Sequence, residues 1–166
     1  MTAGGVAIRA ERAEDADAVH ALLVAVFDGA AEAGLVRRLR AEGDIALALV
    51  EEQGGQVVGH IAFPRLHVDG LPVAGLAPLG VRPDRQRAGI GQRLVETGLA
   101  VLKDARTPLV FVLGDPVYYG RFGFSVAAAQ GFACVYAGSH FQALRLAGSA
   151  PGHGAVRYPP AFDSLA

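Results

Sequence analysis

Cysteine is nearly absent from this sequence, and its scarcity excludes the disulfide-stabilised class of small proteins. Cys134 is the one cysteine among 166 residues, so no disulfide can form within the chain. Chains of this kind are typical of reducing compartments, and we expect a cytoplasmic protein. We expect Cys134 itself to be a small, buried, apolar residue.

Long hydrophobic runs are missing as well. No apolar segment reaches the roughly 18 residues that a membrane-spanning helix requires. The first residues, MTAGGVAIRAERAED, contain no apolar core of the kind that a secretory signal carries. We therefore expect no membrane association.

The chain also lacks an excess of charge of either sign. The chain has 15 basic and 16 acidic residues and a formal net charge of −1. Nucleic-acid-binding domains usually show a basic excess, so we expect no nucleic-acid partner. The composition is globular, with 52% hydrophobic and 19% charged residues, and the length fits a single domain over residues 1–166.

Apolar periodicity and turn signals divide the chain into elements. We expect strands at 6–10, 45–51, 56–68, 72–81 and 108–113, and helices at 13–27, 30–43 and 89–105. Asp115 and Pro116 should open a further short helix, because Asp caps helices and Pro suits their first turn. Four short apolar segments predict strands at 124–128, 132–136, 143–146 and 156–158.

The connections between these elements predict the topology. The dipeptides GG at 54–55 and DG at 69–70 are hairpin signals, so the three middle strands should form an antiparallel meander. The helix at 89–105 should then cross over, which makes strands 72–81 and 108–113 parallel neighbours. The expected fold class is α/β, with a mixed α+β sheet.

The stretch RPDRQRAGIGQRLVE at 82–96 joins a strand to a helix. Backbone N–H groups at a helix N-terminus have no intrahelical partner, and the helix dipole adds partial positive charge there. Glycines let a ligand approach the backbone closely. Gln86, Gly89 and Gly91 therefore predict a site for phosphate or pyrophosphate. The arginines that could add charge to this site are Arg85, Arg87 and Arg93.

The short G-x-G spacing alone is compatible with more than one role for this loop. Gly89 and Gly91 could simply shape a tight turn between strand and helix. A P-loop would need G-x-x-x-x-G-K-[ST], which the sequence lacks. A dinucleotide site would need a third glycine, and Leu94 stands at that position.

Two longer segments, in this order along the chain, resemble the GCN5-related N-acetyltransferases, the GNAT superfamily. PLGVRPDRQRAGIGQRLVE at 78–96 resembles that family's acetyl-CoA-binding segment, whose signature is [Q/R]-x-x-G-x-[G/A]. VFVLGDPVYYGRFGF at 110–124 resembles its later motif, in which a tyrosine stands four residues before Gly-Phe. The form LGDPxYYGRFGF, with VRYPPAF at 156–162, looks like the YhbS-like subgroup.

The resemblance implies the GNAT acyl-CoA N-acyltransferase fold, in which the strand before the phosphate loop splays away from its parallel neighbour. The pantetheine arm of acetyl-CoA then pairs with the open edge like an added strand. A backbone N–H in this strand should face the thioester carbonyl and stabilise the developing oxyanion. The positions that the resemblance assigns to cofactor binding are Leu79, Gly80, Val81, Gln86, Arg87, Ala88, Gly89, Ile90, Gly91, Gln92 and Tyr119.

The reaction implied is direct transfer of an acetyl group from acetyl-CoA to a primary amine through a tetrahedral intermediate. No covalent enzyme intermediate and no metal ion are required, and most of the rate should come from positioning the reactants. Tyr119 is implied as the general acid that protonates the departing thiolate. Its neighbour Tyr118 should point about 100° away on a helix, so we expect only Tyr119 to face the cofactor.

An alkyl amine must lose a proton before it attacks, so the reaction needs a general base. The sequence identifies this base less clearly than it identifies the acid. His60 lies in a central strand, in VVGHIAF, and is our candidate, although a strand histidine is often structural. His67, Glu32 and Asp115 are further candidates, of which Asp115 better suits the role of a helix cap. A water chain or an already neutral amine is equally compatible with the sequence.

The acceptor is not identified by any motif. A small-molecule amine, a protein N-terminus and a lysine side chain all remain open. Members of the superfamily are often dimers, and the C-terminal strands could pair across a two-fold axis. An alternative within the same fold is a non-catalytic module that binds acyl-CoA as a sensor.

Overall fold

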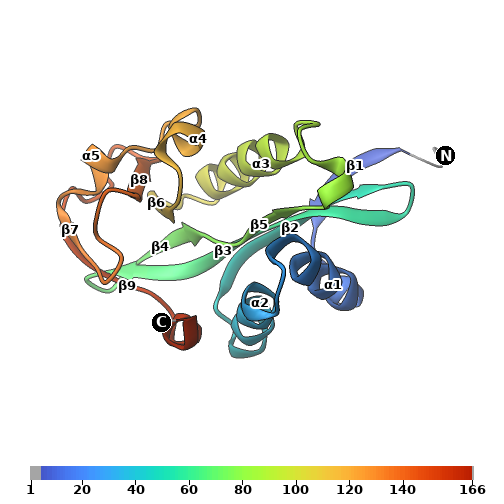
Figure 1. Cartoon of the computed structure of the whole chain (residues 1–166). Helices are drawn as coiled ribbons and strands as arrows, with labels where there is room; N and C mark the ends of the chain where they lie inside the picture. The colour runs from blue at the N-terminus through green and yellow to red at the C-terminus, as the bar shows by residue number, and fades with distance from the viewer. Residues whose placement is uncertain (1–4, 166) are drawn as a thin grey trace.

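A mixed β-sheet with helices on both faces forms the computed structural model, which describes residues 5–165. Helices α1 and α2 lie on one face of the sheet and α3 lies on the other (Figure 1). The strands are β1 (Val6–Ala10), β2 (Ile45–Gln53), β3 (Gln56–Val68), β4 (Leu71–Leu76), β5 (Leu79–Val81), β6 (Leu109–Leu113), β7 (Phe132–Ala133), β8 (Phe141–Arg145) and β9 (Gly154–Arg157). The helices are α1 (Ala16–Phe27), α2 (Ala31–Glu42), α3 (Ile90–Asp104), α4 (Pro116–Gly120) and α5 (Val126–Ala129), with 3-10 turns at Ala13–Asp15, Pro83–Arg85 and Pro160–Leu165.

The predicted meander and crossover are confirmed. Strands β1, β2, β3 and β4 pair antiparallel in sequence order, and the two hairpin turns lie where the glycine signals placed them. After the crossover through α3, β6 pairs with β4 in parallel, and β8 then pairs antiparallel with β6. A right-handed strand–helix–strand connection makes β4 and β6 neighbours in this way.

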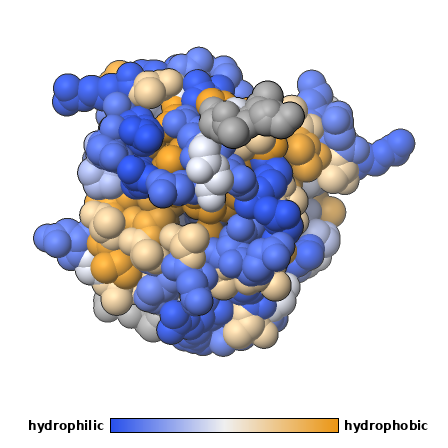
Figure 2. Space-filling view, turned by 90° about the vertical axis from the view of Figure 1, so that its right-hand side faces the viewer, coloured by the Kyte–Doolittle hydropathy of each residue, from blue (hydrophilic) through white to orange (hydrophobic). Residues whose placement is uncertain are grey.

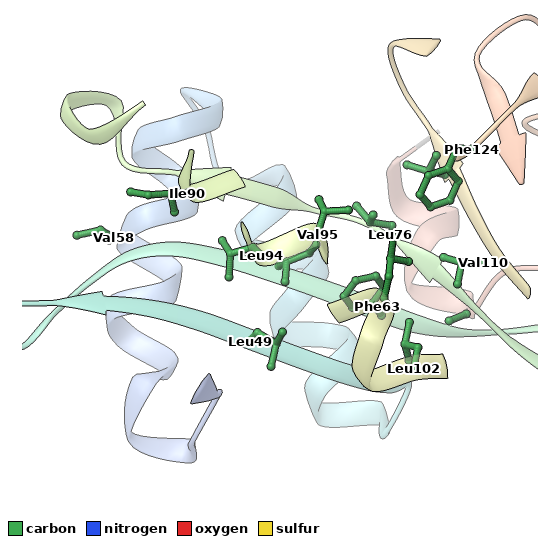
Figure 3. Close-up of a cluster of buried hydrophobic side chains, with 14 residues drawn as sticks. Leu49, Val58, Phe63, Leu76, Ile90, Leu94, Val95, Leu102, Val110 and Phe124 are labelled. Atoms are coloured by element: carbon green, nitrogen blue, oxygen red, sulfur yellow. The ribbon is translucent and has the colours of Figure 1, made fainter. Parts of the chain in front are cut away.

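Helix α3 fixes one layer of the core against the sheet. Its buried side chains, among them Ile90, Leu94 and Val95, recur at the helical period and pack against the strands (Figure 3). Leu94 is fully buried, and burial of a leucine side chain stabilises a fold by roughly 1.5–3 kcal/mol. This packing places the N-terminal end of α3 beside β5, where a Cβ on Gly91 would lie 3.7 Å from Val81 Cγ2.

The predicted strand over 72–81 is in fact two strands, β4 and β5, separated by Ala77 and Pro78. Pro78 has no N–H to donate to a ladder, so regular pairing is interrupted there. The last parallel pair between β4 and β6 is Leu76 with Val112. Beyond it β5 pairs with β3 alone, and its other edge is open. The splayed parallel strands that the family resemblance implied are therefore present.

Several C-terminal expectations are wrong in detail. The segment predicted as a strand at 124–128 instead contains the short helix α5, because Ser125 caps it by accepting a hydrogen bond from Ala128 N (3.0 Å) and alanines favour helix. The strand predicted at 132–136 is reduced to β7, and β8 begins before the predicted residue 143. The 3-10 turn Pro160–Leu165 was not predicted.

The helices of the described residues, 5–165, include none that combines enough length with enough apolar character to cross a bilayer. The longest of these helices, α3, carries polar side chains on its outer face.

Candidate active site

The loop between β5 and α3 presents a row of backbone donors that the fold does not use. None of the N–H groups of residues 86–92 makes a well-formed hydrogen bond to a backbone carbonyl within the described part of the chain. Gly89 is the N-cap of α3 and has φ +83°, a left-handed conformation that glycine adopts without steric cost. Free donors at a helix N-terminus, together with the helix dipole, form an anion site.

A cavity of about 370 Å³ opens directly onto this loop. It is lined by Val81, Gln86, Arg87, Gly89, Ile90, Gly91, Gln92, Tyr118 and Arg121. The loop lies at the right of Figure 1, and Figure 2 views that side of the molecule. Apolar surface gathers in the middle of this face, and hydrophilic side chains border it (Figure 2). The backbone donors of the loop, with Arg87 beside them in the lining of the cavity, suit the anionic end of a ligand.

The three arginines expected to add charge differ in their pairing. Arg93 donates to the buried Glu51 through Nη2 (2.8 Å) and Nε (3.1 Å), so its charge is neutralised. It also donates to Ala88 O (3.3 Å), and this bond ties the loop to β2. Arg85 lies 3.9 Å from Asp84 and does not line the cavity. Of the three predicted arginines, only Arg87 lines the cavity.

Two hydrogen bonds at the ends of β5 show which of its backbone groups face β3. Ala62 N–H donates to Pro78 O (3.1 Å), and Arg82 N–H donates to Val58 O (2.8 Å). Backbone groups of an antiparallel strand alternate between its two edges. Gly80, which lies two residues from each of these positions, therefore also directs its N–H and C=O toward β3.

The backbone groups of Leu79 and Val81 consequently lie on the open edge of β5. Gln86 Nε2 donates to Val81 O (3.1 Å), so this predicted site residue helps to fix the loop on the strand. Gly80 was expected among the cofactor-binding residues, but a Cβ there would lie 2.9 Å from Leu23 Cδ2 of α1. Its lack of a side chain lets α1 pack on the sheet.

Both tyrosines of the later motif are near the site, in different places. Tyr118 lines the loop cavity, and its hydroxyl would lie 3.0 Å from a Cβ on Gly91. Of the two tyrosines, it is thus Tyr118 that lines this cavity, and the expectation that only Tyr119 faces the cofactor stays a prediction. Tyr119 packs deeper, with its ring edge-to-face on Tyr118 (5.0 Å) and on Phe124 (5.9 Å). Burial, and secondarily the neighbouring Tyr118, raises the pKa of Tyr119 to about 12, so its phenol is protonated at neutral pH.

Close contacts on either side hold Tyr119 in place. A Cβ on Gly114 would lie 2.6 Å from Tyr119 Cε2, so only glycine admits the ring there. The buried Gln142 of β8 donates through Nε2 to Gly114 O (3.0 Å). The predicted cap of α4 is confirmed, since Asp115 accepts from Val117 N (2.9 Å). Gln142 was not predicted, because only the β6–β8 pairing brings it to Gly114.

His60 lies on the opposite face of the sheet from α3. It pairs across strands with Val50, which belongs to the cluster under α1 and α2, and paired residues point to the same face. It is fully buried, its Nε2 lies 2.9 Å from Glu11 Oε1, and its Nδ1 has no partner among the described residues. Arg40 in turn lies 3.0 Å from Glu11.

Glu11 is a candidate functional residue that sequence reasoning missed. Burial opposes its ionisation, but the hydrogen bond from His60 and the charge of Arg40 hold the pKa of Glu11 below its usual range. An ionised Glu11 accepts a hydrogen bond from His60 Nε2–H, which leaves His60 Nδ1 with a free lone pair. A carboxylate that orients an imidazole in this way is a recurring arrangement in general-base catalysis.

Within the described residues, no group of three or more His, Cys, Asp or Glu side chains is placed to share a metal ion. The other base candidates are set apart from the His60–Glu11 pair. His67 lines a different cavity, beside β9, and Asp115 serves as the cap of α4.

Comparison with known proteins gives a consistent result. Residues 7–127 match the family model described as an acetyltransferase (GNAT) domain. The chain is 41% identical over 148 residues to the uncharacterized N-acetyltransferase YhbS of Escherichia coli K12, covering 86% of this chain and 89% of that protein.

Two solved structures are similar over almost the whole chain. One is E. coli YhbS in complex with CoA, with a TM-score of 0.88 and 37% identity over 98% of this chain and 94% of that one. The other is a GNAT family acetyltransferase from Brucella melitensis in complex with acetyl-CoA, with a TM-score of 0.83 and 36% identity over 96% and 99% of the two chains.

Proposed function

The chain belongs to the GNAT family of N-acetyltransferases, in the YhbS-like subgroup, and from this premise we propose that it transfers the acetyl group of acetyl-CoA to a primary amine by direct attack. One observation carries the proposal. The unused N–H groups of residues 86–92 adjoin the open edge of β5. Relatives of similar structure hold CoA or acetyl-CoA.

The two parts of this site would bind two parts of the donor. The loop N–H groups, from Arg87 to Gln92, would hold the pyrophosphate at the N-terminus of α3. The amides of the pantetheine arm would pair with the open-edge groups of Leu79 and Val81, as a peptide strand does in strand addition. Binding along β5 would lead the thioester toward the point where β5 and β6 separate.

The chemistry then needs three functions from the chain. The amine nitrogen attacks the thioester carbonyl carbon and forms a C–N bond, while the carbonyl oxygen becomes an oxyanion. The N–H of Leu79 or Val81 would stabilise this oxyanion. The C–S bond then breaks, the Tyr119 hydroxyl gives its proton to the thiolate, and the amine proton leaves to a base. The products are an N-acetylated amine and CoA.

For the base we propose His60, oriented by Glu11. With its proton on Nε2, which lies 2.9 Å from Glu11 Oε1, His60 has an unpartnered Nδ1 that can accept a proton. His60 is fully buried, so the proton would pass to it through a water molecule. The acceptor amine, whether a small molecule or a protein amine, would approach from this face of the sheet.

We expect Glu11→Gln to lower turnover at pH 7 by at least about tenfold, since general acid–base groups typically contribute about a hundredfold or more. An amide can donate to His60 Nε2 and thereby turn the proton onto Nδ1, which removes the free lone pair. Acetyl-CoA affinity should remain unchanged, because Glu11 lies on the opposite face of the sheet from the loop. Turnover and calorimetric affinity, measured over the neutral pH range, check this result.

The matched control is Glu14→Gln, since Glu14 is an exposed acid three residues further along the chain, paired with Arg12 at 3.3 Å. It should behave like the unmodified chain. If Glu11→Gln retains full turnover and the same pH profile, the His60–Glu11 pair has no part in proton transfer.

The overall activity is tested by following CoA thiol release with acetyl-CoA and a panel of primary amines, including a polyamine, a lysine peptide and a free peptide N-terminus. Release that depends on one class of amine supports the proposal and identifies the acceptor class. Tight binding of acetyl-CoA without release for any amine would instead indicate a sensor module of the same fold.

A further inference from the structure

Arg121 lines the loop cavity together with the first residues of α3. Its guanidinium carbon lies 4.8 Å from the centroid of the Tyr118 ring, and both residues line the cavity. A guanidinium within about 6 Å of a tyrosine ring centroid is attracted to the face of the ring. Tyr118 therefore places a cation on the wall of this cavity.

Arg121 also forms no ion pair with a carboxylate of the described residues. Around the loop, Arg93 pairs with Glu51 (2.8 Å) and Arg82 pairs with Asp84 (2.7 Å). No carboxylate of the described residues lies within 4.0 Å of the Arg121 guanidinium or the Arg87 guanidinium. The cavity therefore has two cationic side chains without acidic partners among the described residues, Arg87 on the loop and Arg121 at the end of α4.

The proposed donor also carries anionic charge in two places. CoA has a pyrophosphate and a separate phosphate on the ribose 3′ oxygen. The pyrophosphate would occupy the N–H groups of the loop, beside Arg87. A cation that binds this separate phosphate must lie close to it, because surface charges are screened by salt over about 10 Å at 0.1 M.

Given the proposed function, on which this inference rests, we propose that Arg121, held on Tyr118, binds the 3′-phosphate and gives the chain a preference for CoA over dephospho-CoA. Arginine presents several N–H donors in one plane and suits a phosphate group. The loop signature alone did not indicate this role, since Arg121 lies beyond α3 and β6 in the chain and reaches the cavity only through α4.

Calorimetric titration with CoA and with dephospho-CoA tests this role. For Arg121→Ala we expect CoA affinity to fall about tenfold, the lower end of the effect of hydrogen bonds to charged groups. Dephospho-CoA affinity should not change, so the preference between the two should disappear. The preference of the unmodified chain should also shrink at high salt, because the contact is exposed.

Two variants separate this contact from general effects. Arg85→Ala removes a nearby arginine that is close to Asp84 (3.9 Å) and lies outside the cavity, and it should leave both affinities unchanged. Tyr118→Leu keeps Arg121 but removes its ring platform, and it should reduce the preference for CoA.

The outcomes are distinguishable from failure of the proposed function. If the unmodified chain binds neither nucleotide, the proposed function itself fails. If it binds both equally, or if Arg121→Ala weakens both by the same factor, acyl-CoA binding stands and the assignment of Arg121 to the 3′-phosphate is overturned.

Discussion

Gly89→Glu is expected to weaken acetyl-CoA binding by at least about a hundredfold, because placing like charges against each other costs several kcal/mol. Gly89 is the N-cap of α3, at the centre of the unused N–H groups. A glutamate there would direct a carboxylate at the site proposed for the pyrophosphate. Its side chain would also compete for the backbone donors. Calorimetry with acetyl-CoA measures the loss.

A second substitution separates charge from backbone strain. Gly89 has φ +83°, and a non-glycine residue in the left-handed region costs roughly 1–2 kcal/mol. Gly89→Ala therefore carries the strain without the charge, and it should retain measurable binding. Circular dichroism would establish that both variants fold. If Gly89→Glu binds acetyl-CoA as tightly as the unmodified chain does, the phosphate site lies elsewhere.

Tyr119→Phe is expected to lower turnover at least about tenfold, since general acids typically contribute about a hundredfold or more, and to leave acetyl-CoA affinity nearly unchanged. The ring packing against Gly114 and Phe124 is retained in phenylalanine. Only the hydroxyl is lost. Burial raises the pKa of Tyr119 to about 12, so the phenol carries its proton at neutral pH but is a weaker acid than a free thiol of pKa about 8.5.

Because the pKa of Tyr119 is higher than that of a free thiol, proton transfer from Tyr119 to the thiolate is unfavourable in water. Proton transfer from Tyr119 becomes favourable only if the departing thiolate is also destabilised by its apolar surroundings. The defect of Tyr119→Phe should therefore be smaller with thioesters of more acidic thiols, which leave without proton transfer. Tyr136→Phe, which alters a tyrosine packed in another cluster, is the control and should keep full turnover. Equal turnover for Tyr119→Phe would exclude Tyr119 as the acid.

The sequence predicted those parts of the fold that depend on local signals. The two hairpins follow from adjacent turn residues, and the crossover follows from a helix between two apolar strands. The break in the strand at Pro78 was missed because a single proline also suits a strand edge. The helix at Val126–Ala129 was missed because four apolar residues fit either period, and the cap by Ser125 decided between them.

The sequence predicted those site residues that lie close together in one segment of the chain. The loop signature places Gln86, Gly89 and Gly91 together in the chain, and the structure leaves their neighbouring N–H groups free. Residues that reach the site through tertiary packing gave no such signal. Glu11 contacts His60 across 49 positions of the chain, and the charge of Arg93 is cancelled by Glu51 across 42.

Titration of the purified chain with acetyl-CoA by isothermal calorimetry measures whether the loop before α3 and the open edge of β5 form an acyl-CoA site. We predict saturable binding at one site per chain, with a dissociation constant in the micromolar range, lost in Gly89→Glu. Absence of heat and of saturation with acetyl-CoA, by a chain shown to be folded, would contradict the account.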